Sequence, residues 1–111
     1  MKGTYLGEFE EIVLLTVGVL YDEAYGPSIK KEVEERTGRK VNLSAIHATL
    51  NRLDEKGFLS SRLGEATAKR GGKRKKYFAV TKLGVKALEE AKNLRESLWV
   101  SIPKIALQGG E

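Results

Sequence analysis

The chain has 111 residues, with 20 Lys and Arg against 15 Asp and Glu, which gives a net charge of +5. It is 41% hydrophobic and 32% charged, which is typical of one globular domain with a well-solvated surface. The absence of cysteine excludes disulfides and thiolate metal sites. The longest apolar run, residues 12–20, is about half as long as a membrane span requires, so we expect a cytoplasmic protein that makes no membrane contact.

The positive charge is concentrated in residues 62–77. This segment has seven Lys and Arg against one Glu, a local charge of +6, whereas the other 95 residues sum to −1. Like charges repel, so such a segment costs stability unless a polyanion neutralises it. Nucleic acid is the simplest such partner, and a solvated, disordered charge run is the alternative that composition leaves open.

Residues 8–21, EFEEIVLLTVGVLY, are predicted to form the first helix. Three glutamates stand in its first turn, where the helix dipole favours negative charge. Apolar residues cover more than one face, so we expect burial on more than one side. The β-branched content leaves a strand as the alternative.

A second helix is expected to begin at Pro27, which suits the first helical position, and to end at Gly38. The connection before it, YDEAYG, contains Tyr25, which either packs the turn into the core or stacks at the surface.

Asn42 is a good N-cap for a third helix, and Gly57 marks its end. Ile46, Leu50 and Leu53 form one inward stripe at helical spacing. The opposite face is small or polar and free of acidic side chains until the last turn, a character that suits the major groove of DNA. An ordinary solvated face is the alternative.

Residues 58–63 and 76–80 are predicted to be short antiparallel strands that carry a long cationic tip. Thr81 is expected to cap a final helix that starts near Lys82, and Pro103 should end or kink it. The expected organisation is therefore a DNA-binding domain at 1–80, a C-terminal helix at 81–103 and a flexible tail at 104–111.

The order helix, helix, helix, hairpin, helix is that of a winged helix-turn-helix, a mainly α fold with a small β-hairpin. The third helix would enter the major groove, and the hairpin, or wing, would lie along adjacent phosphates. The candidate recognition residues are Asn42, Ser44, His47, Ala48, Asn51 and Arg52. The candidate wing residues are Lys69, Arg70, Lys73, Arg74, Lys75 and Lys76.

The segments LGEFEEIVLLTVGVL, EAYGPSIKKEVEERTGRKVNLSAIHATLNRLDEKGFLSSRLGE and RGGKRKKYFAVTKLGVKAL resemble the PadR family of winged-helix transcription regulators. The resemblance covers roughly residues 6–90 and implies a homodimer that binds a palindromic operator, usually as a repressor, and sometimes responds to a small effector. The family commonly has tyrosine where this chain has His47. The sequence leaves open whether His47 contacts a base, a phosphate or neither, and whether Arg52 contacts a phosphate or forms an ion pair.

The resemblance also implies that the C-terminal helix lies in the dimer interface. Its apolar residues at helical spacing are Leu88, Ala91, Leu94, Leu98 and Ile102, with Trp99 beside them. Trp99 either packs in that interface or forms a wall of a pocket for a small aromatic effector.

Two other functions remain as alternatives, a nonspecific architectural nucleic-acid binder and a winged-helix adaptor for other proteins. An enzyme is not expected, because the sequence has no nucleophile–base pair and no phosphate-binding glycine loop before a helix. His47 is the only histidine, so no metal site and no cofactor are expected.

Overall fold

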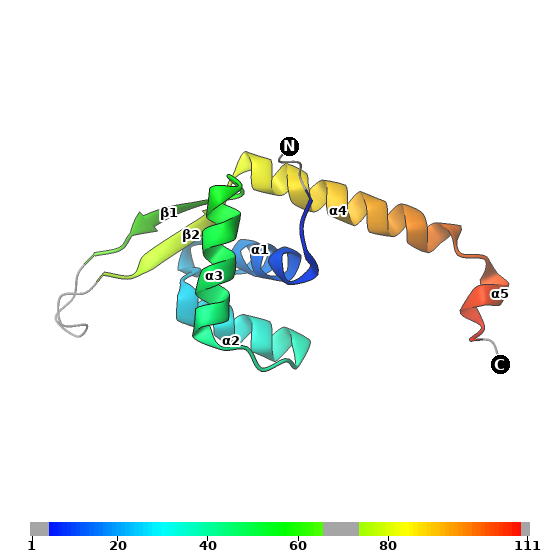
Figure 1. The fold of residues 1–111 in the computed structure, drawn as a ribbon, viewed down its shortest axis with the longest axis horizontal. Coiled ribbons are helices and arrows are strands. Elements are labelled where there is room, and N and C mark those ends of the chain that lie inside the picture. Colours follow the sequence, from blue (N-terminus) through cyan, green and yellow to red (C-terminus); the bar gives the residue numbers. More distant parts are fainter. Residues whose placement is uncertain (1–4, 66–73, 110–111) are drawn as a thin grey trace.

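The computed structural model describes residues 5–65 and 74–109, in which three helices precede a β-hairpin and a long final helix (Figure 1). The element bounds are α1 Glu8–Leu20, the 3-10 turn η1 Tyr21–Glu23, α2 Gly26–Thr37, α3 Leu43–Glu55, β1 Leu59–Leu63, β2 Lys76–Val80, α4 Lys82–Ser101 and α5 Lys104–Leu107. The prediction of a mainly helical winged helix-turn-helix with a small hairpin is confirmed.

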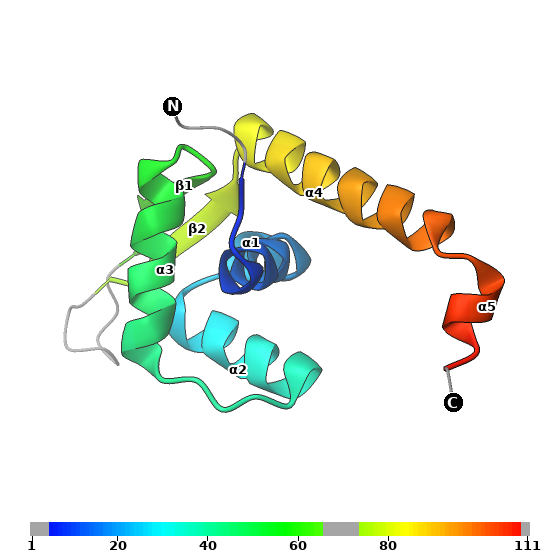
Figure 2. The ribbon, with the colours of Figure 1, turned by 45° about the vertical axis from the view of Figure 1, so that its right-hand side comes forward.

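Helix α1 lies in the middle of the fold and contacts α2, α3, β2 and α4 (Figure 2). Val13 and Leu14, which are adjacent and therefore point in different directions, are both fully buried. The expected burial on more than one side is confirmed, and the strand alternative is wrong. The helix ends one residue earlier than predicted, at Leu20, where η1 begins.

The helix-turn-helix is formed by α2 and α3, which are joined by residues 38–42 (Figure 2). Gly38 ends α2 with φ of +72°, a left-handed conformation that glycine adopts without a steric penalty. Pro27 occupies the second rather than the first helical position, because α2 begins at Gly26. Asn42 caps α3 as predicted, since its side-chain oxygen accepts a hydrogen bond from the backbone N–H of Ala45 at 2.7 Å.

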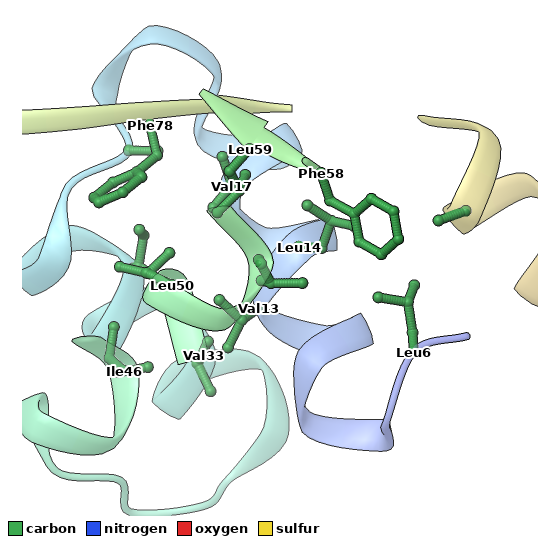
Figure 3. Packing of buried hydrophobic residues seen from close by; sticks show 14 residues of the cluster. Leu6, Val13, Leu14, Val17, Val33, Ile46, Leu50, Phe58, Leu59 and Phe78 are labelled. Atoms are coloured by element: carbon green, nitrogen blue, oxygen red, sulfur yellow. The ribbon is translucent and has the colours of Figure 1, made fainter. Parts of the chain in front are cut away.

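The core fills the space between the three helices and the inner face of the hairpin (Figure 3). The predicted stripe of α3, formed by Ile46, Leu50 and Leu53, is fully buried. Phe78 of β2 lies over Leu50, so the hairpin closes one side of the same core. Burying this stripe fixes the rotation of α3 about its axis, and its opposite face is left exposed.

The wing is an antiparallel hairpin in which Leu59 pairs with Val80 and Leu63 with Lys76. A third chain segment extends it, because the Phe78 N–H donates to the Ala24 carbonyl at 2.8 Å. Tyr25 also forms a bridge with Tyr77. The connection between η1 and α2 thereby fixes the direction in which the hairpin leaves the domain.

Helix α4 begins at Lys82 after the predicted Thr81 cap and extends away from the domain (Figure 1). A Cβ at Gly84 would collide with the backbone carbonyl of Phe58, so glycine allows the first turn of α4 to approach the hairpin closely. The helix ends at Ser101, before Pro103, as predicted. Within the expected tail, residues 104–107 form the short helix α5, and all its side chains are exposed.

The acidic first turn of α1 holds other parts of the fold by ion pairs. Glu8 pairs with Arg39 in the connection between α2 and α3. Glu11 pairs with Arg95 of α4, whose guanidinium donates at 2.7 Å. The sequence analysis assigned this turn only to the helix dipole, because residues 84 positions apart give no local sign of a contact.

Glu10, between these two, anchors the end of α3. Its carboxylate is 8% exposed and accepts hydrogen bonds from Lys56 at 2.8 Å and from the Gly7 N–H at 2.9 Å. Arg52 lies farther away, at 3.4 Å. Burial opposes ionisation of Glu10, but the hydrogen bonds from Lys56 and Gly7 and the positive charge of Lys56 outweigh it, so the pKa of Glu10 lies below its usual value.

We predict that Glu10→Gln lowers the free energy of unfolding at pH 7, and that its deficit relative to wild type shrinks in acid. The folded protein holds the Glu10 carboxylate ionised more readily than the unfolded chain does. Its charge therefore stabilises the fold above the ordinary pKa of 4.5, and this contribution is lost as the pH falls through the lowered pKa.

Urea unfolding of both proteins between pH 7 and pH 3 measures this deficit. Glu55→Gln, which neutralises an exposed carboxylate at the end of α3, is the control and should show a much smaller deficit. A Glu10→Gln deficit of constant size across this range would contradict the role of the ion pairs.

Candidate nucleic-acid interface

One exposed face of α3 carries most of the recognition residues named from the sequence. They follow the spacing i, i+3, i+4 and i+7, and all are exposed: Ser44, His47, Ala48 and Asn51. Because this face is opposite the buried stripe, it is the side of α3 that a DNA groove can receive.

Two residues at the start of α3 are already engaged within the chain. The Asn42 side-chain oxygen accepts from the Ala45 N–H and from the Ser44 hydroxyl, both at 2.7 Å. This oxygen therefore serves the helix cap. His47 and Asn51 lie farther along the exposed face, and His47 packs against the start of α2.

The position of His47 depends on a glycine. A Cβ at Gly26 would lie 2.8 Å from His47 Cε1 and 3.0 Å from His47 Nε2. These distances are shorter than carbon and nitrogen atoms normally allow, so any larger residue at position 26 would displace the ring. The glycine of the EAYG segment thus lets the His47 ring lie close to the start of α2. This contact was not predicted from the sequence.

Arg52 lies in an ion pair in this structure. Its Nε is 3.4 Å from Glu10, and its Nη2 donates to the Thr49 hydroxyl at 3.1 Å. The sequence left a phosphate contact and an ion pair open for Arg52. Since Lys56 satisfies Glu10 at the shorter distance, Arg52 is the more weakly held of the two cations.

The wing contributes cations beside this helix. Arg74 and Lys76 are exposed and Lys75 is half-buried. Lys69, Arg70 and Lys73, which the sequence analysis also assigned to the wing, lie outside the described residues. The described part of the wing is therefore its stem, the two strands and the residues next to them.

At this stem, two cations lie on tyrosine rings. The Arg62 Cζ is 4.6 Å from the ring centre of Tyr77, and the Lys75 Nζ is 4.4 Å from that of Tyr25. Arg62 belongs to the basic segment 62–77 but was not predicted from the sequence as a site residue. Strand register would have revealed it, because Arg62 pairs directly with Tyr77.

The residues assigned to dimerisation divide into two groups. Leu88 packs against the core of its own chain, and Ala91 and Ile102 are half-buried. Leu94 and Leu98 are each 61% exposed and Trp99 is 62% exposed, which is unusual for large apolar side chains on one helix.

Hollows lie beside α4 on both sides of the Glu11–Arg95 ion pair. One, of about 430 Å³, has Tyr5, Leu6, Leu94 and Leu98 in its lining. Another, of about 420 Å³, has Leu15, Val85 and Leu88 in its lining. Trp99 lines neither of them.

The described residues contain no cluster of three or more His, Asp or Glu side chains arranged to hold a metal ion. In the same part of the chain, every helix is too short or too polar to cross a membrane.

Solved structures similar to this chain include PadR-like regulators. One from Bacillus cereus is 20% identical with a TM-score of 0.71, and the match covers 93% of each chain. One from Bacteroides fragilis is 24% identical with a TM-score of 0.71, covering 87% of this chain and 88% of that one. These two likenesses show a shared fold.

The complex structure of hsRosR-S1 is 26% identical, with a TM-score of 0.68, and the match covers 87% of this chain and 79% of that one. RosR is a protein of H. salinarum. No curated protein matches the chain significantly. The family model described as the transcriptional regulator PadR-like family matches residues 14–90, most of the chain. The chain therefore belongs to the PadR-like family of transcriptional regulators, which are DNA-binding regulators and not enzymes.

Proposed function

We propose that this protein is a homodimeric, sequence-specific repressor that binds a palindromic operator and is released by a small effector. The observation that carries the proposal is the exposed face of α3, which lies beside a wing whose cations have no carboxylate partner among the contacts described. DNA offers base edges that the polar face of α3 can hydrogen-bond, and its phosphates supply negative charge to the cationic wing.

The two surfaces have different tasks in this proposal. The polar side chains of α3 contact base edges and give sequence preference, with Asn51 suited to an adenine edge. The wing cations contact phosphates, which adds affinity without sequence preference. The hsRosR structures, described as complexes, belong to a similar fold and are consistent with a binding role.

The exposed apolar surface of α4 supports a dimer. A second copy would cover Leu94, Leu98 and Trp99, and two α3 helices would then read half-sites about 34 Å apart or a multiple of that distance. Trp99, placed in the cleft between two copies, offers a flat surface on which a small aromatic effector can stack. Such a ligand would release the protein from DNA by changing the distance between the two α3 helices.

Selection of bound duplexes from a random pool tests sequence specificity. We expect an enriched palindrome, because two identical α3 helices related by a two-fold axis read the same half-site twice. Tight binding without any enriched sequence would instead indicate a nonspecific architectural protein. No binding at low salt would indicate a protein–protein adaptor.

We predict that Asn51→Ala and Lys76→Gln weaken binding in different ways. Asn51→Ala should lower affinity for the operator by about 10- to 100-fold while leaving unrelated duplexes little affected, since a base contact contributes roughly 1–3 kcal/mol of discrimination. Lys76→Gln should lower affinity for all duplexes alike and reduce the salt slope by about one per lost phosphate contact.

Fluorescence anisotropy at several salt concentrations measures both effects. Lys104→Gln removes the same charge from the exposed helix α5 and is the control for net charge. If Asn51→Ala leaves the preference for the operator unchanged, Asn51 does not contact a base.

We predict that Leu98→Glu dissociates the dimer, because it places a charge in the apolar surface that the second copy would cover. Light scattering should give twice 12.3 kDa for wild type and a single chain for the variant. Operator affinity should fall at least about 100-fold, since the two half-sites no longer bind as one unit. Asn93→Glu, which adds the same charge on the opposite side of α4, should remain a dimer, and a monomeric wild type would contradict the proposed assembly.

A further inference from the structure

Among the described residues, two sets of cations differ in the partners of their charged groups, and the two sets are separated in space. Cations that hold the helices together pair with carboxylates of the first turn of α1; they are Arg39, Arg52, Lys56 and Arg95. Three of the described cations at the stem of the wing lie on aromatic rings instead; they are Arg62, which also donates to the Asp22 carbonyl at 3.4 Å, Lys75 and Lys76. A carboxylate cancels a positive charge, whereas a ring orients the cation and leaves its charge in place.

The two shortest of these ring contacts belong to one connected group. The Lys75 Nζ is 4.4 Å from the centre of the Tyr25 ring, and the Arg62 Cζ is 4.6 Å from the centre of the Tyr77 ring. The two rings are 5.7 Å apart between centres and tilted by 53°, a favourable geometry for an aromatic pair. Four side chains from three chain segments thus form a row across the stem.

The backbone explains why this row exists. Arg62 and Tyr77 are directly opposite in the antiparallel register, so they share one face of the hairpin. Tyr25 joins that face because it forms a bridge with Tyr77. A Cβ at Gly64 would lie 2.8 Å from Tyr77 Cε2, so the glycine in the LGE segment leaves room for the ring.

We propose that Tyr25 and Tyr77 are positioning residues for DNA binding, which hold Lys75 and Arg62 at the wing stem as charged, pre-oriented phosphate ligands. This inference rests on the proposed function and adds Arg62 to the set of DNA-binding cations. A free lysine or arginine loses side-chain entropy when it is fixed on a phosphate. A ring that already restricts the side chain lowers that cost without cancelling the charge.

The test compares Tyr25→Leu with Tyr25→Phe. Leucine keeps much of the apolar bulk but has no aromatic face, whereas phenylalanine keeps the face and loses only the hydroxyl. We expect Tyr25→Leu to lower affinity for operator and unrelated duplexes alike, by about two- to fivefold per half-site, the range of an exposed cation–π contact. Tyr25→Phe should bind like wild type.

A double-mutant cycle that combines substitutions of Tyr25 and Lys75 distinguishes a positioning role of Tyr25 from a structural role. If Tyr25 acts through Lys75, Tyr25→Leu should have little further effect in a Lys75→Gln background. Equal losses in both backgrounds would show that Tyr25 merely supports the fold, and would overturn the inference. Tyr5→Leu, at a tyrosine that is 80% exposed and belongs to the N-terminal segment, is the matched control. Thermal unfolding of each variant identifies losses that come from instability.

The outcomes distinguish this inference from the proposed function. If wild type ignores all duplexes at low salt, the proposed function fails and this inference fails with it. If wild type binds and Tyr25→Leu binds with the same affinity and salt slope, only the positioning role is wrong. A loss confined to the operator would place Tyr25 among base-reading residues and would also overturn it.

Discussion

The burial of one apolar stripe of α3 is the constraint on which the rest of this structure depends. Ile46, Leu50 and Leu53 are completely enclosed by α1, α2 and the inner face of the hairpin. Because this side is buried, the rotation of α3 about its own axis is fixed. The small polar side chains on the opposite side therefore face solvent. The same core contains Phe78 of β2, so α3 and the wing are held by one set of contacts.

Charge is distributed so that the core's neighbours are neutralised and the wing is not. Carboxylates in the first turn of α1 pair with cations of α3, α4 and the connection between α2 and α3. The first turn of α1 is thus paired by charge with both α3 and the long helix α4. At the described stem of the wing, Arg62 and Lys75 contact tyrosine rings, which leave their positive charge in place. The repulsion that would make this segment unfavourable is the property that a DNA-binding wing requires.

Glycines set several of the distances between these parts. Gly84 lets α4 approach the hairpin, Gly26 leaves room for His47 on α3, and Gly64 leaves room for the Tyr77 ring. Each of these glycines is needed because a side chain there would collide with a neighbouring group, and none of the three has a left-handed backbone. The geometry of the candidate interface therefore depends on residues that do not themselves contact a ligand, and this is why variation near such glycines can alter binding from outside the contact surface.

The sequence alone determined the elements and their order, because helix periodicity, the caps at Asn42 and Thr81, and the aromatic and β-branched residues of 76–80 are local signals. It also identified the exposed face of α3, since four residues at helical spacing share a face wherever the helix lies. Only the tertiary structure decided the partners of the charged and aromatic side chains: Arg52 with Glu10, Lys75 with Tyr25, and His47 beside Gly26. The residues of each such pair lie 21 to 50 positions apart, and their meeting depends on helix packing and strand register, which no local pattern specifies.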